Sequence, residues 1–280
     1  VVNGPLAIRS SSLLEDSHYQ PFAGIYSTYM IPCAGDKYMR LNMLSNAIKG
    51  VYASVFYRAS KDYMVATSNV IDQEKMAVIL QEVVGQEYAS GFYPTISGVG
   101  RSINYYPIGD EKADEGVVEL ALGLGKYIVD GGLCLRVCPH HPDKVLQTSE
   151  MEIALRETQT SFFALDTSPV DGAGQQGLQF QVDDAFNLKR VTVRDADKDG
   201  SLRWIVSTYD PYDQCIYDGY YEGKNRKIVS FSGVLQNDVF PLPELLRKVL
   251  DYGQKEMGRP VEIEFAVNLH DNKQGEFYLL

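Results

Sequence analysis

Apolar residues recur at helical intervals in three parts of the chain. Residues 36–59 carry apolar side chains close to helical spacing and predict one helix that ends near Arg58. Residues 243–258 predict a second helix, because proline favours the first turn of a helix and glycine favours its end. A capping pattern at residues 149–152 predicts a third helix that runs to about Leu165.

Shorter apolar runs predict strands. Residues 6–11 form one such run, and residues 76–80 are short and branched enough to form a buried strand. Residues 88–106 alternate aromatic with small residues, which is typical of a twisted antiparallel pair. The runs 190–194 and 202–206 flank a polar turn and predict a hairpin. Together, these elements predict an α+β fold with a mostly antiparallel sheet and packing helices.

Composition narrows the function classes. The 280 residues are 45% apolar, so the chain can bury a large core. It has 26 basic and 37 acidic residues, and a net charge of -11 argues against general affinity for nucleic acid or an anionic membrane. The sequence has neither an apolar run approaching the ~20 residues that span a bilayer nor a signal-peptide pattern. Four cysteines fit a reducing compartment, and we expect a cytoplasmic protein.

Two polar clusters resemble metal sites only in part. Residues 134–141 contain two cysteines and two histidines but lack the second ligand pair of a closed zinc site, and residues 133–137 alternate as a strand. We therefore favour a structural role over zinc. Residues 195–200 copy the first half of a calcium loop, but its twelfth position is Val206 rather than glutamate. We expect a solvated hairpin tip there, without calcium.

The first predicted strand delivers Arg9 and Ser10 toward a turn. A planar guanidinium offers paired donors to phosphate oxygens, and a small hydroxyl adds a donor while letting the backbone come close. This combination indicates a polyphosphate site. The alternative is a strand end with a solvated arginine and an ordinary serine-rich turn.

Glu262 and Glu264 lie two residues apart in a run whose other positions are apolar. In a strand their side chains would share one face, roughly 7 Å apart along the strand. Two carboxylates on one face suit a hard ion such as magnesium that bridges ATP phosphates. The alternative is the solvated side of a half-buried strand.

A glycine-rich stretch at residues 123–131 fails the common phosphate-loop patterns. A P-loop would need glycine in place of Leu120 and a hydroxyl in place of Tyr127, and a dinucleotide fingerprint would need glycine in place of Ile128.

Five ordered segments resemble the ATP-binding domain of phosphoenolpyruvate synthase and pyruvate phosphate dikinase, which is an ATP-grasp domain. The segments are RSSSLLEDS with FAG (9–17 and 22–24), VYASVFYR (51–58), QEVV with SGFYPT (81–84 and 90–95), GLGKYIVDG (123–131) and PVEIEFA (260–266). They cover most of the chain and are far more specific together than any one of them alone.

The resemblance implies roles for individual residues. Arg9 and Arg58 would clamp the phosphates, and Arg101 would be a weaker anion contact. The family's hinge between two subdomains, whose main-chain groups pair with the adenine edge, corresponds to Gln81, Glu82, Val83 and Val84. Two alternatives stay open: Arg58 as a cation at a helix end, and the hinge segment as a buried strand end.

The resemblance also implies a loop that closes over the nucleotide and a metal ligand. Gly123 and Gly125 would belong to the loop, with Lys126 standing where the family usually has an acid. This change of charge puts the contact to ribose or adenine in doubt, although a lysine could turn to the phosphates. Glu264 would hold Mg²⁺, with Glu262 in support.

The expected function is that of the ATP- and magnesium-binding part of a phosphotransferase. By resemblance, a phosphoryl group passes from ATP to a histidine on another domain and then to pyruvate, so the expected partners are that histidine domain and a pyruvate-binding domain of the full-length chain. The alternatives are a nucleotide-sensing regulatory module without turnover, and a related enzyme with another acceptor.

The resemblance further predicts a division of the chain. Residues 1–142 and 258–280 would form the ATP-grasp core, and residues 143–257 a family-variable elaboration of helices and hairpins. We expect the chain to be cut from a longer protein, without the first lysine-bearing subdomain and without the Gln-x-Arg segment that follows the last strand. Such a fragment should be inactive alone and bind Mg-ATP weakly.

Overall fold

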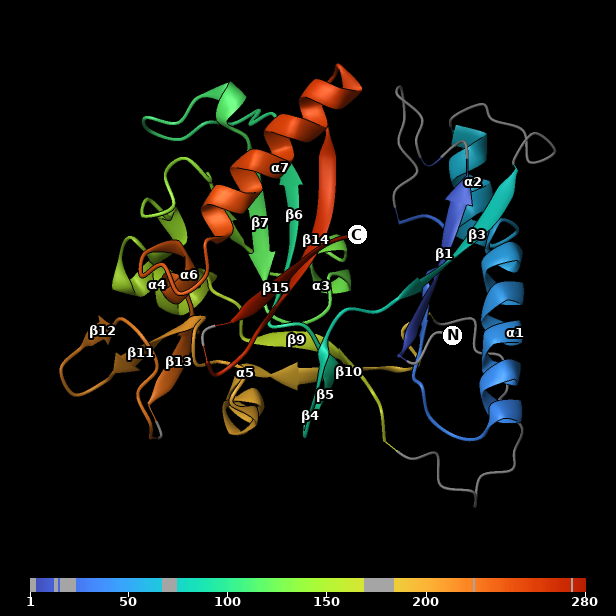
Figure 1. Cartoon of the computed structure of the whole chain (residues 1–280), viewed down its shortest axis with the longest axis horizontal. Helices are drawn as coiled ribbons and strands as arrows, with labels where there is room; N and C mark the ends of the chain where they lie inside the picture. Colours follow the sequence, from blue (N-terminus) through green and yellow to red (C-terminus); the bar gives the residue numbers. More distant parts are fainter. Residues whose placement is uncertain are drawn as a thin grey trace. The chain divides into compact units, whose positions relative to one another are not determined.

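The computed structural model describes residues 4–12, 15, 24–66, 75–168, 184–223, 225–272 and 274–280. The chain divides into two compact units (Figure 1). Unit 1 comprises residues 1–83 and 165–189, and unit 2 comprises residues 84–164 and 190–280. Of the helices in these described ranges, none combines the length and apolarity that crossing a bilayer requires.

Unit 1 is a three-stranded antiparallel sheet covered by a helix. Its strands lie in the order β2 (Tyr29–Ile31), β1 (Leu6–Ser12), β3 (Met76–Glu82). The helices are α1 (Lys37–Ser54) and α2 (Arg58–Ala66). Ile8 and Tyr29 of the sheet pack with Val51 of α1 in the core of the unit.

The prediction of one helix over residues 36–59 is wrong, because two helices occupy this region. The buried Ser54 hydroxyl donates to the Val51 carbonyl at 2.7 Å, and the Ser60 hydroxyl donates to the Ser54 carbonyl at 2.7 Å. These hydroxyls bond carbonyls at the end of α1, and such local bonds compete with helix continuation. Arg58 consequently begins α2 instead of lying near a last turn.

The strand predicted at residues 76–80 exists as β3, but it is not buried. Ile79 is 47% exposed and Leu80 is 51% exposed. The reason is the position of β3 at the edge of the described sheet, where one strand neighbour is missing.

Unit 2 is built on a five-stranded antiparallel sheet. Its order is β15 (Gly275–Leu279), β14 (Glu262–Leu269), β6 (Ile96–Arg101), β7 (Val117–Ala121), β8 (Leu135–Val137). Helix α7 (Leu242–Met257) packs against β6 and ends at Gly258, whose φ of 62° is left-handed (Figure 1). The helix predicted at residues 243–258 is therefore confirmed.

The remaining described strands form two smaller sheets. One has the order β10 (Leu188–Thr192), β9 (Ser161–Leu165), β5 (Gly91–Tyr93), β4 (Gln86–Tyr88), and the boundary between the units crosses the ends of β9 and β10. The other has the order β12 (Cys215–Tyr217), β11 (Val206–Asp210), β13 (Arg226–Val229). The short helices are α3 (Lys126–Val129), α4 (Met151–Glu157), α5 (Val193–Ala196), α6 (Ser232–Leu235), η2 (Ala113–Glu115), η3 (Leu146–Thr148) and η4 (Asp197–Asp199).

Two sequence predictions fail in the β9 and β10 region. The helix predicted from residue 149 to Leu165 stops at Glu157, and Ser149 bonds the Leu146 carbonyl instead of capping the helix. The hairpin predicted across residues 195–200 is replaced by α5 and η4, because the Thr192 hydroxyl accepts the Asp195 N–H at 3.1 Å and starts a helix.

The acidic segment at residues 195–200 was predicted to be a solvated hairpin tip, but one of its carboxylates contacts a buried aromatic residue. Asp199 accepts the hydroxyl of Tyr93 at 2.8 Å. The aromatic stretch 88–106 also differs from its prediction, since β4 and β5 form a hairpin whereas β6 joins the five-stranded sheet. The α+β class with antiparallel sheets and packing helices is confirmed.

Candidate functional site

Arg9 and Gln81 face the same side of the unit 1 sheet. The β1–β3 register places Ala7 opposite Gln81 and Arg9 opposite Ile79, so the two polar side chains are diagonal neighbours. Arg9 Nη1 donates to Gln81 Oε1 at 3.2 Å. Two residues predicted for phosphate and adenine are thus brought together within unit 1.

Ser10 points to the other face from Arg9, because successive side chains alternate along a strand. Its hydroxyl donates to Glu15 Oε1 at 2.6 Å, and the Ser12 N–H donates to Glu15 Oε2 at 2.9 Å. Glu15 therefore closes the turn after β1. Residues 13–14 and 16–23 of the same resembling segment lie outside the described residues.

The segment from Gln81 to Val84 crosses the boundary between the units, which falls after Val83. The Val83 N–H donates to the Pro5 carbonyl at 2.9 Å. Backbone groups alternate between the two edges of an antiparallel strand, so the N–H and carbonyl of Glu82 point to the outer edge of β3. That edge has no strand partner among the described residues.

The side chain of Arg58 is almost fully exposed, with a relative exposure of 95%. Arg58 is the first residue of α2, at the positive end of that helix, and it follows closely after the end of α1. Its guanidinium lies 3.5 Å from the carboxylate of Asp62, one helical turn later. Exposed pairs of this kind are weak and leave the arginine available.

In unit 2, the register of the large sheet aligns a row of side chains across four strands. Glu264 of β14 lies opposite Val99 of β6, Val99 lies opposite Glu119 of β7, and Glu119 lies opposite Arg136 of β8. Directly paired residues share a face, so the two glutamates flank Val99 on one side of the sheet. Both glutamates are half-buried.

Glu262 shares this face with Glu264, as the period-2 pattern predicted, but its nearest described partner is basic. Arg101 lies opposite Glu262, and Arg101 Nε donates to Glu262 Oε2 at 2.6 Å. This bond raises the pKa of Arg101. The side chains are 43% and 58% exposed, so the pair contributes little to stability and both groups stay accessible.

Sequence reasoning missed Glu119. The signal was present, because Glu119 lies between the buried residues Val118 and Leu120 in an alternating run. What could not be read from the sequence is that β6 alone separates β7 from β14, which sets Glu119 and Glu264 roughly 10 Å apart between their backbones.

The glycine loop folds onto the same face of the sheet. Tyr127 and Ile128 of α3 pack with Val99 and Ala121. Gly123, at the start of the loop, is fixed by a hydrogen bond in which its carbonyl accepts the Ser97 hydroxyl at 2.6 Å. The φ of Gly123 is 89°, a backbone conformation that requires glycine.

Gly125 has no such structural requirement. Its backbone is helical, with φ -57°, and an added Cβ would meet only the Cβ of Ser97 at 3.9 Å. The next residue, Lys126, places its Nζ 3.3 Å from Asp130 Oδ1, and its side chain is 20% exposed. The loop thus brings a backbone without a covering side chain at Gly125 to the face that carries Glu119 and Glu264, and Lys126 follows it directly in the chain.

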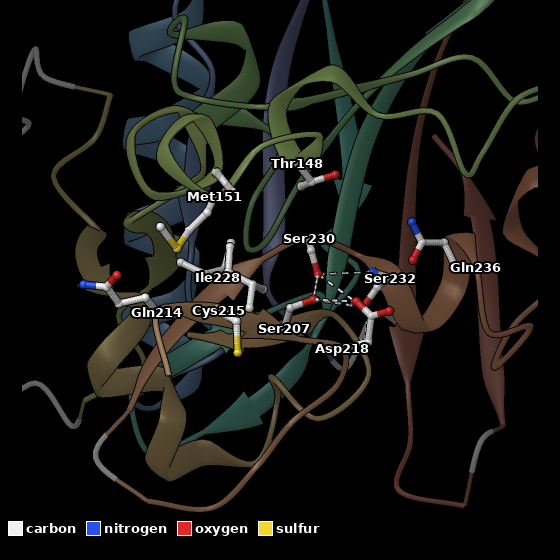
Figure 2. A pocket seen from close by; sticks show the side chains of 12 residues that line it. Thr148, Met151, Ser207, Gln214, Cys215, Asp218, Ile228, Ser230, Ser232 and Gln236 are labelled. Atoms are coloured by element: carbon white, nitrogen blue, oxygen red, sulfur yellow. Dashed lines mark hydrogen bonds between the residues drawn. The ribbon is translucent and has the colours of Figure 1, made fainter. Parts of the chain in front are cut away.

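A pocket of about 340 Å³ lies elsewhere in unit 2, and no predicted site residue lines it. Figure 2 shows the hydroxyls of Ser207, Ser230 and Ser232 directed toward one another beside Asp218. Ser207 Oγ lies 2.7 Å from Ser230 Oγ and donates to Asp218 Oδ1 at 3.4 Å. The volume of this pocket suits a small ligand. The residues that line the pocket all fall within residues 143–257, the segment predicted to be a family-variable elaboration.

Comparison with known proteins adds the family. A comparison with curated proteins found none that matches the chain. The family model described as pyruvate phosphate dikinase, AMP/ATP-binding domain, matches residues 2–280. This confirms the resemblance found in the sequence, and the antiparallel sheets with packing helices fit an ATP-grasp-like domain. The chain therefore belongs to the pyruvate phosphate dikinase AMP/ATP-binding domain family.

Proposed function

We propose that this domain binds Mg-ATP and serves phosphoryl transfer to a histidine on another domain of the full-length protein, with pyruvate as the final acceptor. The family membership supports a nucleotide-binding role in a kinase or dikinase context. One observation carries the proposal furthest: the glycine loop and the carboxylates of Glu119 and Glu264 occupy the same face of one sheet.

The carboxylates fit a magnesium ion by their chemistry. Mg²⁺ prefers oxygen ligands and is commonly held by one or two carboxylates together with substrate phosphates and water. Glu264 would be the principal ligand, and Glu119 or Glu262 would bind it through water. When bound, the ion would neutralise charge on the phosphates.

The phosphates would be held by basic side chains and by the loop. Arg9 and Arg58 of unit 1 would supply guanidinium donors, whereas Arg101 and Lys126 of unit 2 would supply further positive charge. Catalysis in phosphoryl transfer consists mainly of positioning and charge neutralisation.

Adenine would pair with the outer edge of β3. The N–H and carbonyl of Glu82 lie on that edge and provide one donor and one acceptor, which an adenine edge requires. Val83 uses its N–H internally, on Pro5. We therefore assign the main-chain contacts to Glu82 and Val84 and only a positioning role to Val83 and the Gln81 side chain.

The test is titration calorimetry of the chain with ATP in the presence and absence of Mg²⁺. We expect Glu264→Gln to weaken Mg-ATP binding at least tenfold while leaving metal-free ATP binding nearly unchanged. Glu256→Gln, an exposed glutamate of α7, is the control. Full magnesium dependence in Glu264→Gln would refute the metal assignment. In the full-length protein, pyruvate-dependent consumption of ATP tests the acceptor.

The second candidate function is a regulatory module that senses nucleotide without turnover. Two observations favour it: Lys126 replaces the acid usual in the resembling family, and the pocket around Ser207 offers room for a second ligand. A full-length protein that binds Mg-ATP but transfers no phosphoryl group to histidine would support this function over the first.

A further inference from the structure

We propose that Glu115, Cys138 and His141 form a binding site for a divalent transition metal ion, with Zn²⁺ as the expected occupant. One carboxylate oxygen, the thiol sulfur and one ring nitrogen lie within 4.8 Å of one another. None of the residues assigned above to ATP or magnesium belongs to this group.

The fold brings the three residues to one end of a strand pair. In the β7–β8 register, Val118 lies opposite Val137. Glu115 ends η2 just before β7, and Cys138 directly follows β8, so both lie beyond the same end of this antiparallel pair. The chain then turns back, since the His141 N–H donates to the Cys138 carbonyl at 2.9 Å, and this turn returns the imidazole to Glu115.

The distances fit a tetrahedral ion. Zinc bonds of about 2.0 to 2.3 Å separate the ligand atoms of a tetrahedron by roughly 3.3 to 3.8 Å. His141 Nε2 lies 3.1 Å from Glu115 Oε2, and Cys138 Sγ lies 3.9 Å from the same oxygen. Small side-chain rotations would therefore suffice to place an ion between them.

The ligand types select the class of metal. A thiolate, an imidazole and a carboxylate together suit zinc and neighbouring transition metals, whereas magnesium and calcium prefer oxygen ligands throughout. Three protein ligands would leave a fourth position for water. Ions can enter, because the His141 and Glu115 side chains are 24% and 16% exposed, whereas Cys138 is buried.

The surroundings hold the ligands in position. The Lys112 N–H donates to Glu115 Oε2 at 2.9 Å, and this bond fixes the carboxylate. Burial raises the pKa of the Cys138 thiol, and the backbone N–H groups of His140 and His141 offset this only in part, so a bound ion would have to displace the thiol proton. Such outer contacts orient metal ligands.

Two basic side chains near the cluster are paired with carboxylates, which reduces their repulsion of a cation. Arg136 Nη2 lies 2.7 Å from Glu111 Oε2, and Lys144 Nζ lies 2.8 Å from Asp110 Oδ2. The immediate environment therefore accepts a divalent charge.

Sequence spacing favoured a structural role for this cluster because residues 134–141 lack a second ligand pair. The third ligand, Glu115, lies 23 residues before Cys138. Only the register of β7 and β8 places it there. The purely structural role, a hydrogen-bonded cluster without affinity for metal, is the outcome that an experiment must separate from the proposal.

The experiment titrates the metal-free 280-residue chain with ZnCl₂ against a competing chromogenic chelator, and with CoCl₂ by absorption. We expect one Zn²⁺ per chain and a near-ultraviolet charge-transfer band from a thiolate bound to Co²⁺. Cys138→Ser should abolish the band and weaken zinc binding at least tenfold, or about 1.4 kcal/mol. His141→Gln and Glu115→Gln should also weaken zinc binding at least tenfold.

Cys134→Ser and His270→Gln are the matched controls and should change zinc affinity less than about twofold. Thermal unfolding of each metal-free variant checks that it is folded. Absence of the cobalt band in the unsubstituted protein, or equal zinc affinity in Cys138→Ser and Cys134→Ser, would overturn the proposal. The first of these outcomes is decisive even if a variant does not fold.

Discussion

Glu111 and Arg136 form a two-point ion pair in which Arg136 Nη1 donates to Oε1 at 3.0 Å and Nη2 donates to Oε2 at 2.7 Å. The Glu111 side chain is only 5% exposed. It also accepts the Ile108 N–H at 3.0 Å and the Asn104 amide at 2.8 Å. One carboxylate thereby ties the loop between β6 and β7 to β8.

This pair predicts acid sensitivity. The bond from Arg136 lowers the pKa of Glu111 to about 2. A carboxylate whose pKa is lower in the folded state stabilises the fold above its unfolded pKa, and this contribution is lost as the pH falls through the folded pKa. Glu111→Gln should therefore lower the free energy of unfolding at pH 7 by on the order of 2 kcal/mol.

The difference between Glu111→Gln and the unsubstituted protein should shrink as the pH falls from about 4.5 to about 2. Denaturant unfolding at a series of pH values measures it. Asp110→Asn is the control, because Asp110 pairs with Lys144 at the exposed surface and should change stability little. A pH-independent difference would contradict the assignment to this ion pair.

Substitution of the two loop glycines by alanine should change the stability of the fold to very different extents. Gly123→Ala should destabilise the fold by about 2 to 4 kcal/mol, because φ is 89° and a Cβ would lie 2.5 Å from the Phe162 ring. Gly125→Ala should change stability by less than about 1 kcal/mol, since the site is helical and open.

ATP binding is the second measurement on these variants. If the nucleotide lies directly against the backbone of Gly125, the methyl group in Gly125→Ala would stand in its way. Gly125→Ala should then weaken ATP binding several-fold in calorimetry while its thermal stability stays nearly unchanged. Equal ATP affinity in a stable Gly125→Ala protein would exclude close approach at this position.

The outer edge of β3 can be tested with proline. Glu82→Pro removes a backbone N–H that takes no part in the β1–β3 ladder, and proline is tolerated on edge strands where the N–H faces outward. We expect a stable variant that binds ATP at least tenfold more weakly. Leu80→Pro is the matched control, because Leu80 has the same outward orientation two residues earlier.

Glu82→Ala separates the contribution of the side chain. Near-normal ATP binding in Glu82→Ala together with weak binding in Glu82→Pro would identify the main-chain donor. The reverse pattern, or equal losses in Glu82→Pro and Leu80→Pro, would contradict adenine recognition at Glu82.

Arg58 should affect phosphates and not stability. Its side chain is 95% exposed, so Arg58→Gln should leave the melting temperature unchanged. If the guanidinium binds phosphate, the affinity for ATP should fall at least tenfold while that for adenosine stays constant. Arg247→Gln, an exposed arginine of α7, is the control, and parallel titrations with ATP and adenosine give the result.

The sequence alone determined the elements whose pattern is local and strong. The helix α7 follows from its apolar spacing between a proline and a glycine, and β14 follows from strict alternation, which also places Glu262 and Glu264 on one face. The family was readable as well, because five motifs kept their order along the chain.

Local pattern failed where distant partners decide the conformation. Phe162 lies in a strand instead of a helix because the sheet containing β9 buries it, and residues 195–200 coil because Thr192 caps a helix. Propensity is a weak preference that tertiary contacts override.

Only the tertiary structure decided which acidic and sulfur-bearing side chains meet. Glu119 faces the same side as Glu264 because β6 lies between their strands, and Glu115 meets Cys138 because β7 pairs with β8. Strand order and register arise from packing between segments far apart in the sequence. Spacing along the chain therefore placed Glu262 and Glu264 on one face but gave no sign that Glu119 shares it.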